Sequence, residues 1–408
     1  MRLPQTALVP LPTPVEEMNA SFRNKVTKGG KRRSVIGHFK RQTNITTMTN
    51  KIKKFGLLLF ITFGQLTYGQ TNKEKALEKG QEAIKLMDNG KLDESIKLLE
   101  EAQKLDPDRF DYAYELAYAN YAKEDYKGAI KILGNNIDHK DVTERLFQLL
   151  GNSYDVLGKS DEACEAYDAG LKKFPNSGMI YLEKGNVHWN KKEYGKALPF
   201  YEKGIEVDPK FPSNYYRAAR IYCGSTEEVW GLIYGEIFMN LERNSKRTSD
   251  ISKLLYDTYK SEIKFTTDTS MTVSFCQQMT MSVNAISDPK NLKLPFCMIF
   301  ETTLLVSIAF EKSVNIDSLD KIRTTFIDNY FNNEHDKTYP NILFSYQKKV
   351  KEAGHIESYN HWILMKGDED GFDKWQSANK EKWDSFITWF GDNGLKLNDS
   401  NKFYSGQY

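Results

Sequence analysis

Residues that hold metals or act as nucleophiles are few in this sequence, and their spacing fits no common site. The 408 residues include four cysteines and six histidines. No two cysteines form a CxxC pair, and no HExxH, GxSxG or glycine-rich phosphate loop occurs. These absences argue against zinc ribbons, zinc proteases, serine hydrolases and P-loop enzymes, so we expect no cofactor and no metal.

Long apolar runs are also missing from most of the chain. A membrane-spanning helix needs about 20 apolar residues. Residues 296–310 supply fewer and include Glu301, so we expect a buried helix there and no integral span in the mature chain. Charge is divided unevenly, because the net charge is +2 overall whereas the first 69 residues alone carry +10. The remainder is therefore acidic, which argues against general nucleic-acid binding.

The start of the chain has the composition of a targeting segment. Residues 55–63 (FGLLLFITF) are apolar, three lysines precede them, and small residues stand just before Gln70. We expect residues 48–69 to be a cleavable signal peptide for export to the periplasm or cell envelope, or for secretion. Residues 1–47 are then a disordered basic extension upstream of the natural start at Met48. An uncleaved membrane anchor preceded by a basic tail is the alternative.

A spacing of 34 residues organises the chain from residue 73 to residue 242. Apolar side chains recur at three- and four-residue steps in residues 144–175, which predicts two amphipathic helices joined at a turn containing Gly158. Prolines at 107, 175 and 209 are expected to end second helices. Small residues allow two helices to approach closely, and large ones fill the remaining space. Two small columns and one large column repeat every 34 positions: Ala83, Ala117, Gly151, Gly185 and Ala219; Ser95, Ala129, Ala163, Ala197 and Gly231; and Leu99, Leu133, Tyr167 and Tyr201.

This pattern resembles the tetratricopeptide repeat family, in four good repeats and a fifth that departs from the pattern. The departure lies in residues 228–241, where Gly231 and Gly235 stand in the places of a small and a large residue. We expect this helix to form, but the pattern leaves its packing open. The resemblance implies an all-α superhelix of helical hairpins over residues 70–245. In that family the first helices of the hairpins line a concave surface that binds a peptide or a partner helix.

Carried over to this sequence, the resemblance places two kinds of side chain on that surface. The amides of Asn152 and Asn186, one repeat apart, can donate to and accept from a peptide backbone. Trp189 and several tyrosines provide flat apolar area. The predicted binding residues are Tyr114, Tyr118, Tyr121, Gln148, Asn152, Asn186, Trp189, Tyr216 and Arg220. The alternative is that these rows are only solvated, or packed against the second half of the chain. The paired Lys and Asn pattern with which family members clamp a terminal carboxylate is absent.

The 34-residue spacing fades after residue 245, and residues 246–391 are predicted to form a mostly helical domain. Helical periodicity covers residues 251–264, 293–312, 316–329, 342–353, 355–366 and 374–390. Residues 265–282 are rich in Thr, Val, Phe and Ser with partial alternation, which favours a short β-hairpin. Residues 392–408 are polar and are expected to form a loose tail. Leader, repeats and this region together resemble exported repeat proteins of Bacteroidetes-type bacteria, which names no activity for the second half.

Isolated polar groups in the second half have ordinary structural interpretations. His355 and His361 are six residues apart, on different faces of a helix, so we interpret them as structural residues rather than metal ligands. The acidic run 368–370 lacks EF-hand spacing and is expected to cap the following helix. Cys276 and Cys297 can pair as a disulfide in an oxidising compartment.

Two functions from different classes remain open. The first is a non-enzymatic, exported scaffold that binds a protein or peptide on its repeats. The second is an enzyme or small-ligand domain at the C-terminal end, with the repeats as its docking arm. A deep pocket with converging polar side chains in residues 246–408 would favour the second function. A solid apolar core there would favour the first.

Overall fold

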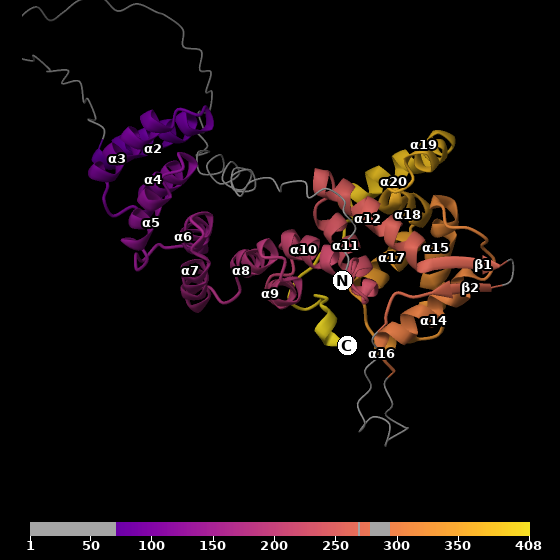
Figure 1. Ribbon diagram of the computed structural model, residues 1–408. Helices are drawn as coiled ribbons and strands as arrows, with labels where there is room; N and C mark the ends of the chain where they lie inside the picture. The colour runs from indigo at the N-terminus through magenta and orange to yellow at the C-terminus, as the bar shows by residue number, and fades with distance from the viewer. Residues whose placement is uncertain (1–70, 268–269, 278–293) are drawn as a thin grey trace, which may run out of the picture. The chain divides into compact units, whose positions relative to one another are not determined.

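The computed structural model describes residues 71–267, 270–277 and 294–408. Within these ranges there are eighteen α-helices and one two-stranded antiparallel sheet, so the fold is all-α with a single hairpin, as predicted (Figure 1). None of the helices described is long and apolar enough to cross a membrane. The expected signal peptide and basic extension lie outside the described residues.

Ten helices follow one another as antiparallel pairs in the repeat region. Helices α3, α7 and α9 each end two residues before a proline, as the sequence predicts. The bounds of these ten helices are α2 (Asn72–Asp88), α3 (Leu92–Leu105), α4 (Phe110–Ala122), α5 (Tyr126–Gly134), α6 (Glu144–Val156), α7 (Ser160–Lys173), α8 (Gly178–Asn190), α9 (Tyr194–Val207), α10 (Pro212–Tyr222) and α11 (Glu228–Leu241).

The chain forms two compact units, one ending at Glu115 and the other running from Leu116 to Tyr408. In the first unit α2 begins at a capping box between Thr71 and Glu74, which satisfies two backbone donors at the helix start. Gly80 of α2 faces the ring of Tyr112, and an added Cβ would lie 2.7 Å from that ring. The small residues of α2 are therefore required by close packing within this unit.

The turn inside each hairpin uses one residue in the left-handed region, at the same place in four repeats. Gly90, Glu124, Gly158 and Lys192 have φ of 75°, 66°, 74° and 61°, and they stand 34 residues apart. Glycine adopts this conformation without cost, whereas a residue with a Cβ is strained by about 1–2 kcal/mol. The turn geometry is therefore imposed by the packing of the two helices, since it persists where the sequence offers Glu or Lys.

Small and large columns meet as the sequence predicts. A Cβ on Gly151 would overlap the ring of Tyr167, and a Cβ on Gly185 would overlap the ring of Tyr201. Both tyrosines are fully buried on the second helices α7 and α9. Each glycine thus provides the space that the tyrosine of its own hairpin occupies.

Gly185→Ala is expected to lower the free energy of unfolding by about 1–3 kcal/mol, because the new methyl group must displace the buried Tyr201 ring. Gly195→Ala in α9 is the matched control, since nothing lies within 4 Å of its added Cβ. That change should be neutral or stabilising by up to about 1 kcal/mol. Urea unfolding of the two variants measures the difference, and equal midpoints would show that the small column is not a packing requirement.

The second half begins with a long helix and ends in a cluster of short ones. The antiparallel hairpin pairs Ile263 with Val273 and Phe265 with Met271, so it begins two residues before the predicted region 265–282, at positions that were predicted to be helical. The bounds are α12 (Lys246–Glu262), β1 (Ile263–Thr267), β2 (Ser270–Val273), α14 (Phe296–Ile308), α15 (Ile316–Asn332), α16 (His335–Thr338), α17 (Ile342–Glu352), α18 (Ile356–Leu364), α19 (Glu369–Ala378) and α20 (Lys380–Asp392).

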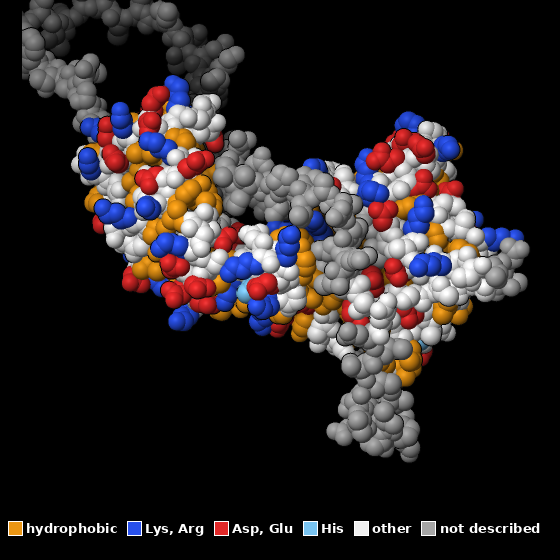
Figure 2. All heavy atoms as spheres, in the orientation of Figure 1, with side chains coloured by type: hydrophobic (Ala, Val, Ile, Leu, Met, Phe, Trp, Pro, Cys, Tyr) orange, Lys and Arg blue, Asp and Glu red, His pale blue; other side chains and the backbone are white. Residues whose placement is uncertain are grey.

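The helix predicted over residues 374–390 is in fact two helices, α19 and α20. The break falls at Asn379, whose backbone and side-chain nitrogens both donate to the Trp375 carbonyl, at 2.9 and 3.0 Å. Asparagine competes with the helix in this way because its amide can replace a backbone partner. At the start of α19, Asp368 accepts from the Gly371 amide at 3.1 Å, which confirms the predicted cap. Acidic side chains gather over α19 and α20 on the face shown in Figure 2.

Helix α11 is enclosed on nearly all sides. An added Cβ would lie 2.5 Å from the Cys223 sulfur at Gly231 and 2.7 Å from the Leu255 side chain at Gly235. The two glycines that depart from the repeat pattern therefore bring α11 close to α10 on one side and to α12 on the other. The fifth hairpin packs well, with α10 against the fourth hairpin and α11 against the second half of the chain in place of a further repeat.

The segment after Gly391 is packed, which corrects the expectation of a loose tail. Leu395, Leu397 and Phe403 are buried. The Ser405 amide donates to the Tyr234 hydroxyl at 2.7 Å, and the ring of Tyr408 stacks on that of Phe296 with centroids 4.8 Å apart. The segment is polar on average, so its few apolar residues did not indicate packing. Their partners lie far away in the sequence.

The end of the hairpin is tied to α14. Cys276 and Cys297 form a disulfide with Cα atoms 6.2 Å apart, a pairing that the sequence left open. The Glu301 carboxylate of α14 accepts from the amides of Phe275 and Cys276 at 2.6 and 3.0 Å. Residues 278–293, which this linkage encloses, lie outside the described residues.

Glu228, at the start of α11, predicts a pH dependence of stability. Burial and the nearby carboxylates of Glu262, Glu227 and Glu301 raise the pKa of Glu228 from 4.5 to about 7. The folded chain then holds a proton that the unfolded chain releases. This stabilisation is complete below pH 4.5 and is lost as the pH rises through 7. We expect unfolding free energy to fall by about 1–3 kcal/mol between pH 4.5 and 8, and Glu228→Gln to remove most of that slope in urea titrations.

Candidate binding face

The first helices α6, α8 and α10 carry a row of polar and aromatic side chains on one side. Because residues three and four apart share a helix face, each helix contributes two or three of them. We call this row the first-helix face, and it consists of Gln148, Asn152, Glu183, Asn186, Trp189, Tyr216, Arg217 and Arg220. It includes six of the nine residues predicted to bind a partner.

The other three predicted residues are tyrosines of α4. Tyr118 and Tyr121 are buried in the second unit, and Tyr121 meets Tyr126 edge-on at 5.2 Å. Burial raises the pKa of Tyr121 to about 12. Tyr114 belongs to the first unit, where it is also buried. These rings are at least as deeply buried as Trp189, which is 9% exposed, and the role of all four side chains in binding stays a prediction.

The two asparagines are held in the same way in successive repeats. Asn152 accepts from the Tyr167 hydroxyl at 2.5 Å, and Asn186 accepts from the Tyr201 hydroxyl at 3.0 Å. Both acceptor oxygens are therefore occupied inside their hairpins. Asn186 also donates to Glu183 at 3.0 Å, whereas the Asn152 amide nitrogen has no hydrogen-bond partner in the described part of the chain. Of the two, Asn152 keeps a donor for a ligand.

Glu183 is a member of the face that the sequence prediction missed. Its carboxylate accepts from Gln148 at 2.8 Å and from Asn186 at 3.0 Å. Burying a carboxylate is costly because it loses its hydration, so a buried carboxylate has to be hydrogen-bonded. The two amides supply these hydrogen bonds to Glu183, and no cation is ion-paired with it in the described residues. The same bonds connect α6 with α8 and fix the orientation of both amide side chains.

Two arginines of α10 lie over the ring of Trp189. The guanidinium carbons of Arg217 and Arg220 are 4.5 and 5.2 Å from its centroid. Arg220 is half-buried and donates to the Tyr216 hydroxyl at 3.3 Å, while Arg217 is only 4% exposed. Burial lowers the pKa of the Arg217 guanidinium, and the like charge of Arg220 lowers it further.

Arg217 is energetically unusual. In the residues described, its side chain makes no ion pair and no hydrogen bond. Burying a cation costs several kcal/mol even after relaxation. A cation–π contact returns about 2 kcal/mol or more when it is desolvated, as it is here. The charge of Arg217 is therefore incompletely compensated within the chain.

A column of the repeat could have identified both missed residues. Positions 115, 149, 183 and 217 stand 34 apart and hold Glu115, Leu149, Glu183 and Arg217. Three of these four positions are charged, whereas the predicted binding residues stand in columns of amides and aromatic residues. Only the structure shows that Glu183 and Arg217 are buried.

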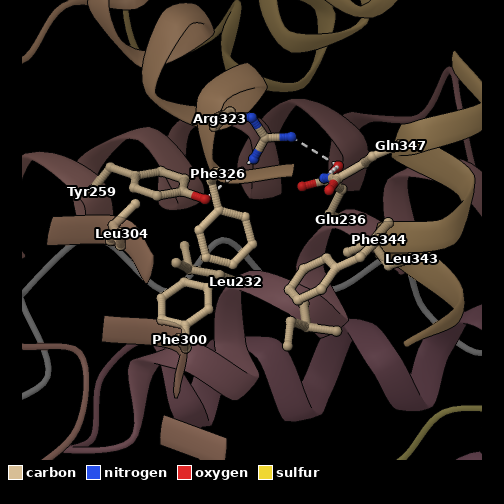
Figure 3. A pocket seen from close by; sticks show the side chains of 11 residues that line it. Leu232, Glu236, Tyr259, Phe300, Leu304, Arg323, Phe326, Leu343, Phe344 and Gln347 are labelled. Atoms are coloured by element: carbon tan, nitrogen blue, oxygen red, sulfur yellow. Dashed lines mark hydrogen bonds and ion pairs between the residues drawn. The ribbon is translucent and has the colours of Figure 1, made fainter. Parts of the chain in front are cut away.

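A pocket that would favour an enzyme has to lie in the second half of the chain. The cavity between α11, α12, α14, α15 and α17 has a volume of about 20 Å³ (Figure 3). That is room for about one water. Its polar groups are bonded to one another, because Arg323 and Gln347 both donate to Glu236, at 2.8 and 2.5 Å. This cavity is too small to admit a substrate. Two open hollows at the surface of the second half are larger, with volumes of about 290 Å³ beside α17 and about 530 Å³ beside α19.

The histidines occupy different environments, as their spacing predicts. The ring of His361 stacks on Trp375 at 4.0 Å and contacts Asp317 at 3.2 Å, whereas His355 lies beside Trp389 at 5.1 Å. They therefore do not converge on one metal position. An open hollow beside α19 is lined by Asp317, Lys374 and Trp375, among others.

Comparison with known proteins identifies the repeats. The tetratricopeptide repeat family matches residues 81–137 and 149–214, so this array is a tetratricopeptide repeat array. The matched residues end before α11, where the hairpin contacts the second half of the chain instead of a further repeat.

The individual relatives are distant. The chain is 25% identical over 143 residues to the TPR repeat-containing protein YpiA of Bacillus subtilis, covering 35% of this chain and 33% of that protein. It is 26% identical over 136 residues to the Hsp70-Hsp90 organizing protein of Triticum aestivum, covering 33% and 23%. The chain thus spans a third or less of the length of these relatives. Among solved structures, pilF of Pseudomonas aeruginosa is 16% identical with a TM-score of 0.40, covering 47% of this chain and 86% of that one.

Proposed function

We propose that the protein is a non-enzymatic scaffold that binds a peptide or protein segment on its first-helix face. The observation that carries the proposal is the pair of arginines over Trp189, beside the amides of a tetratricopeptide repeat array. Aromatic and arginine side chains dominate the energetics of protein interfaces. The name of the wheat relative describes it as an organizing protein for two partners, which is in keeping with a scaffold.

The proposal predicts that Trp189 is required for binding and that an equivalent tryptophan elsewhere is not. Short random peptides displayed on phage would be selected on the immobilised full chain, on Trp189→Ala and on Trp389→Ala. Trp389 is half-buried on α20, away from the repeats. Truncating a central interface aromatic typically costs 2 kcal/mol or more, about 30-fold in affinity.

Peptides that bind the wild type and Trp389→Ala, but not Trp189→Ala, would support the face as the binding site. Peptides that bind all three proteins equally would place binding elsewhere and contradict the proposal. Far-ultraviolet circular dichroism and melting of each variant would show whether a lost interaction reflects a lost fold.

We further propose that the protein is exported through a cleavable signal peptide. The composition of residues 48–69 supports this, and so does the Cys276–Cys297 disulfide, because such bonds persist in oxidising compartments. N-terminal sequencing of the protein from its source should give a start near Gln70. An intact Met1 or Met48 end would contradict export by cleavage.

A further inference from the structure

We infer that Arg217 and Arg220 together receive the side-chain carboxylate of an acidic residue within a bound peptide. This inference rests on the proposed function, because it names the chemistry of a ligand for the same face. It states that the part of a ligand that lies next to the ring of Trp189 carries a negative charge.

The first argument is that neither arginine is ion-paired with a carboxylate, although the charge of Glu183 on the same face partly offsets the lowering of the Arg217 pKa. Arg217 is 4% exposed and has no hydrogen bond or ion pair in the part of the chain that the structure describes. Its nitrogens are nevertheless not among the unpartnered polar atoms sealed from solvent. They therefore keep slight contact with solvent, although the side chain as a whole is 4% exposed. Arg220 has a single hydrogen bond, to Tyr216, and no carboxylate partner in those residues.

The second argument is that the nearby carboxylates are already committed. Glu183 accepts from Gln148 and Asn186 and makes no ion pair with Arg217. Glu242 is ion-paired with Arg247, whose guanidinium also lies 5.2 Å from the centroid of the Tyr216 ring. Neither carboxylate is available to neutralise Arg217 without breaking its own bonds. A direct ion pair with Arg217 therefore requires a carboxylate from outside the described chain.

The geometry selects a planar anion. A guanidinium presents its donors in a flat fork that matches a carboxylate. Here the guanidinium groups of Arg217 and Arg220 both lie over the ring of Trp189. Excluded water strengthens the interaction, since Arg217 is almost fully buried. The sequence lacks the paired Lys and Asn pattern for a terminal carboxylate, so we assign the anion to an aspartate or glutamate side chain inside the segment. The free Asn152 amide nitrogen, two repeats earlier, can then bond the peptide backbone.

The test uses the full chain and random peptides displayed so that no C-terminal carboxylate is free. Selection on the wild type should enrich an acidic residue at one position, and selection on Arg217→Met should not. For a selected peptide made synthetically, Arg217→Met and replacement of its acidic residue by the amide should each weaken binding by about tenfold or more. The two changes combined should weaken it little further, because they remove one interaction.

Three controls keep the outcome interpretable. Arg217→Lys retains charge and should bind with intermediate affinity, and Lys172→Met removes an exposed charge from α7 and should change nothing. Arg217→Met should melt at or above the wild-type temperature, because a poorly compensated buried charge is lost. Trp189-dependent peptides without an acidic residue would overturn this inference while leaving the proposed function standing. Failure to select any Trp189-dependent peptide would overturn both.

Discussion

Arg323→Met should lower the free energy of unfolding by about 3–5 kcal/mol, because it leaves the buried Glu236 carboxylate without its cation. Arg323 of α15 donates to Glu236 of α11 at 2.8 Å, to Asn360 at 2.9 Å and to Tyr259 at 3.2 Å (Figure 3). Burial alone would lower the pKa of Arg323, but the Glu236 charge outweighs it and the pKa is raised. This buried ion pair thus connects α11, the last helix of the repeats, with α15 in the second half of the chain.

Lys351→Met provides the comparison, since it breaks an ion pair with Asp328 that is partly exposed. Exposed pairs contribute at most about 1 kcal/mol, so this variant should unfold close to the wild type in guanidinium titrations. Replacing both Arg323 and Glu236 by Met should recover most of the loss, because no unpaired charge remains. If Arg323→Met were as mild as Lys351→Met, the buried pair would not be a structural link.

Phe403→Ala should destabilise the protein by about 3–5 kcal/mol, as expected for removing a buried aromatic ring. Phe403 is 1% exposed, and its ring lies 6.2 Å from Trp230 and 5.9 Å from Tyr234, both on α11. Loss of the ring should release the end of the chain, so amide exchange at residues 402–408 should accelerate along with the loss of stability.

The same substitution at Phe310 is a stringent control. Phe310 is 95% exposed at the end of α14, so Phe310→Ala should alter the unfolding free energy by no more than about 0.5 kcal/mol. Urea unfolding followed by circular dichroism measures both variants. Equal effects at the two positions would mean that the end of the chain is not part of the folded core.

The repeat architecture was readable from sequence because its packing is local. Gly185 meets Tyr201 within one hairpin, and the same relation recurs 34 residues earlier between Gly151 and Tyr167. Periodicity therefore reports both the helix and its partner. The short hairpin was also predictable, since alternation of residue types is a property of neighbouring positions.

The features that sequence reasoning missed depend on contacts between distant segments. Phe403 stands in a polar stretch, and nothing near it reveals that Trp230 is its neighbour. The helix break at Asn379 needed knowledge of one amide orientation. Arg217 looked like an ordinary charged residue beside Arg220 until its burial against Trp189 was seen. Charge, unlike hydrophobic periodicity, has no spacing from which its partner can be inferred.

Enclosure of α11 by the end of the chain has a consequence for biogenesis. During synthesis from the N-terminus, Trp230 and Tyr234 of α11 emerge well before Phe403 and Tyr408, which cover them in the native protein. Earlier hairpins can close on their own neighbours as they appear, because their contacts are local. The last hairpin has to wait with apolar surface exposed until the final residues are made. We therefore expect it to be the segment most exposed to chaperones, to proteases and to aggregation while the nascent chain is incomplete.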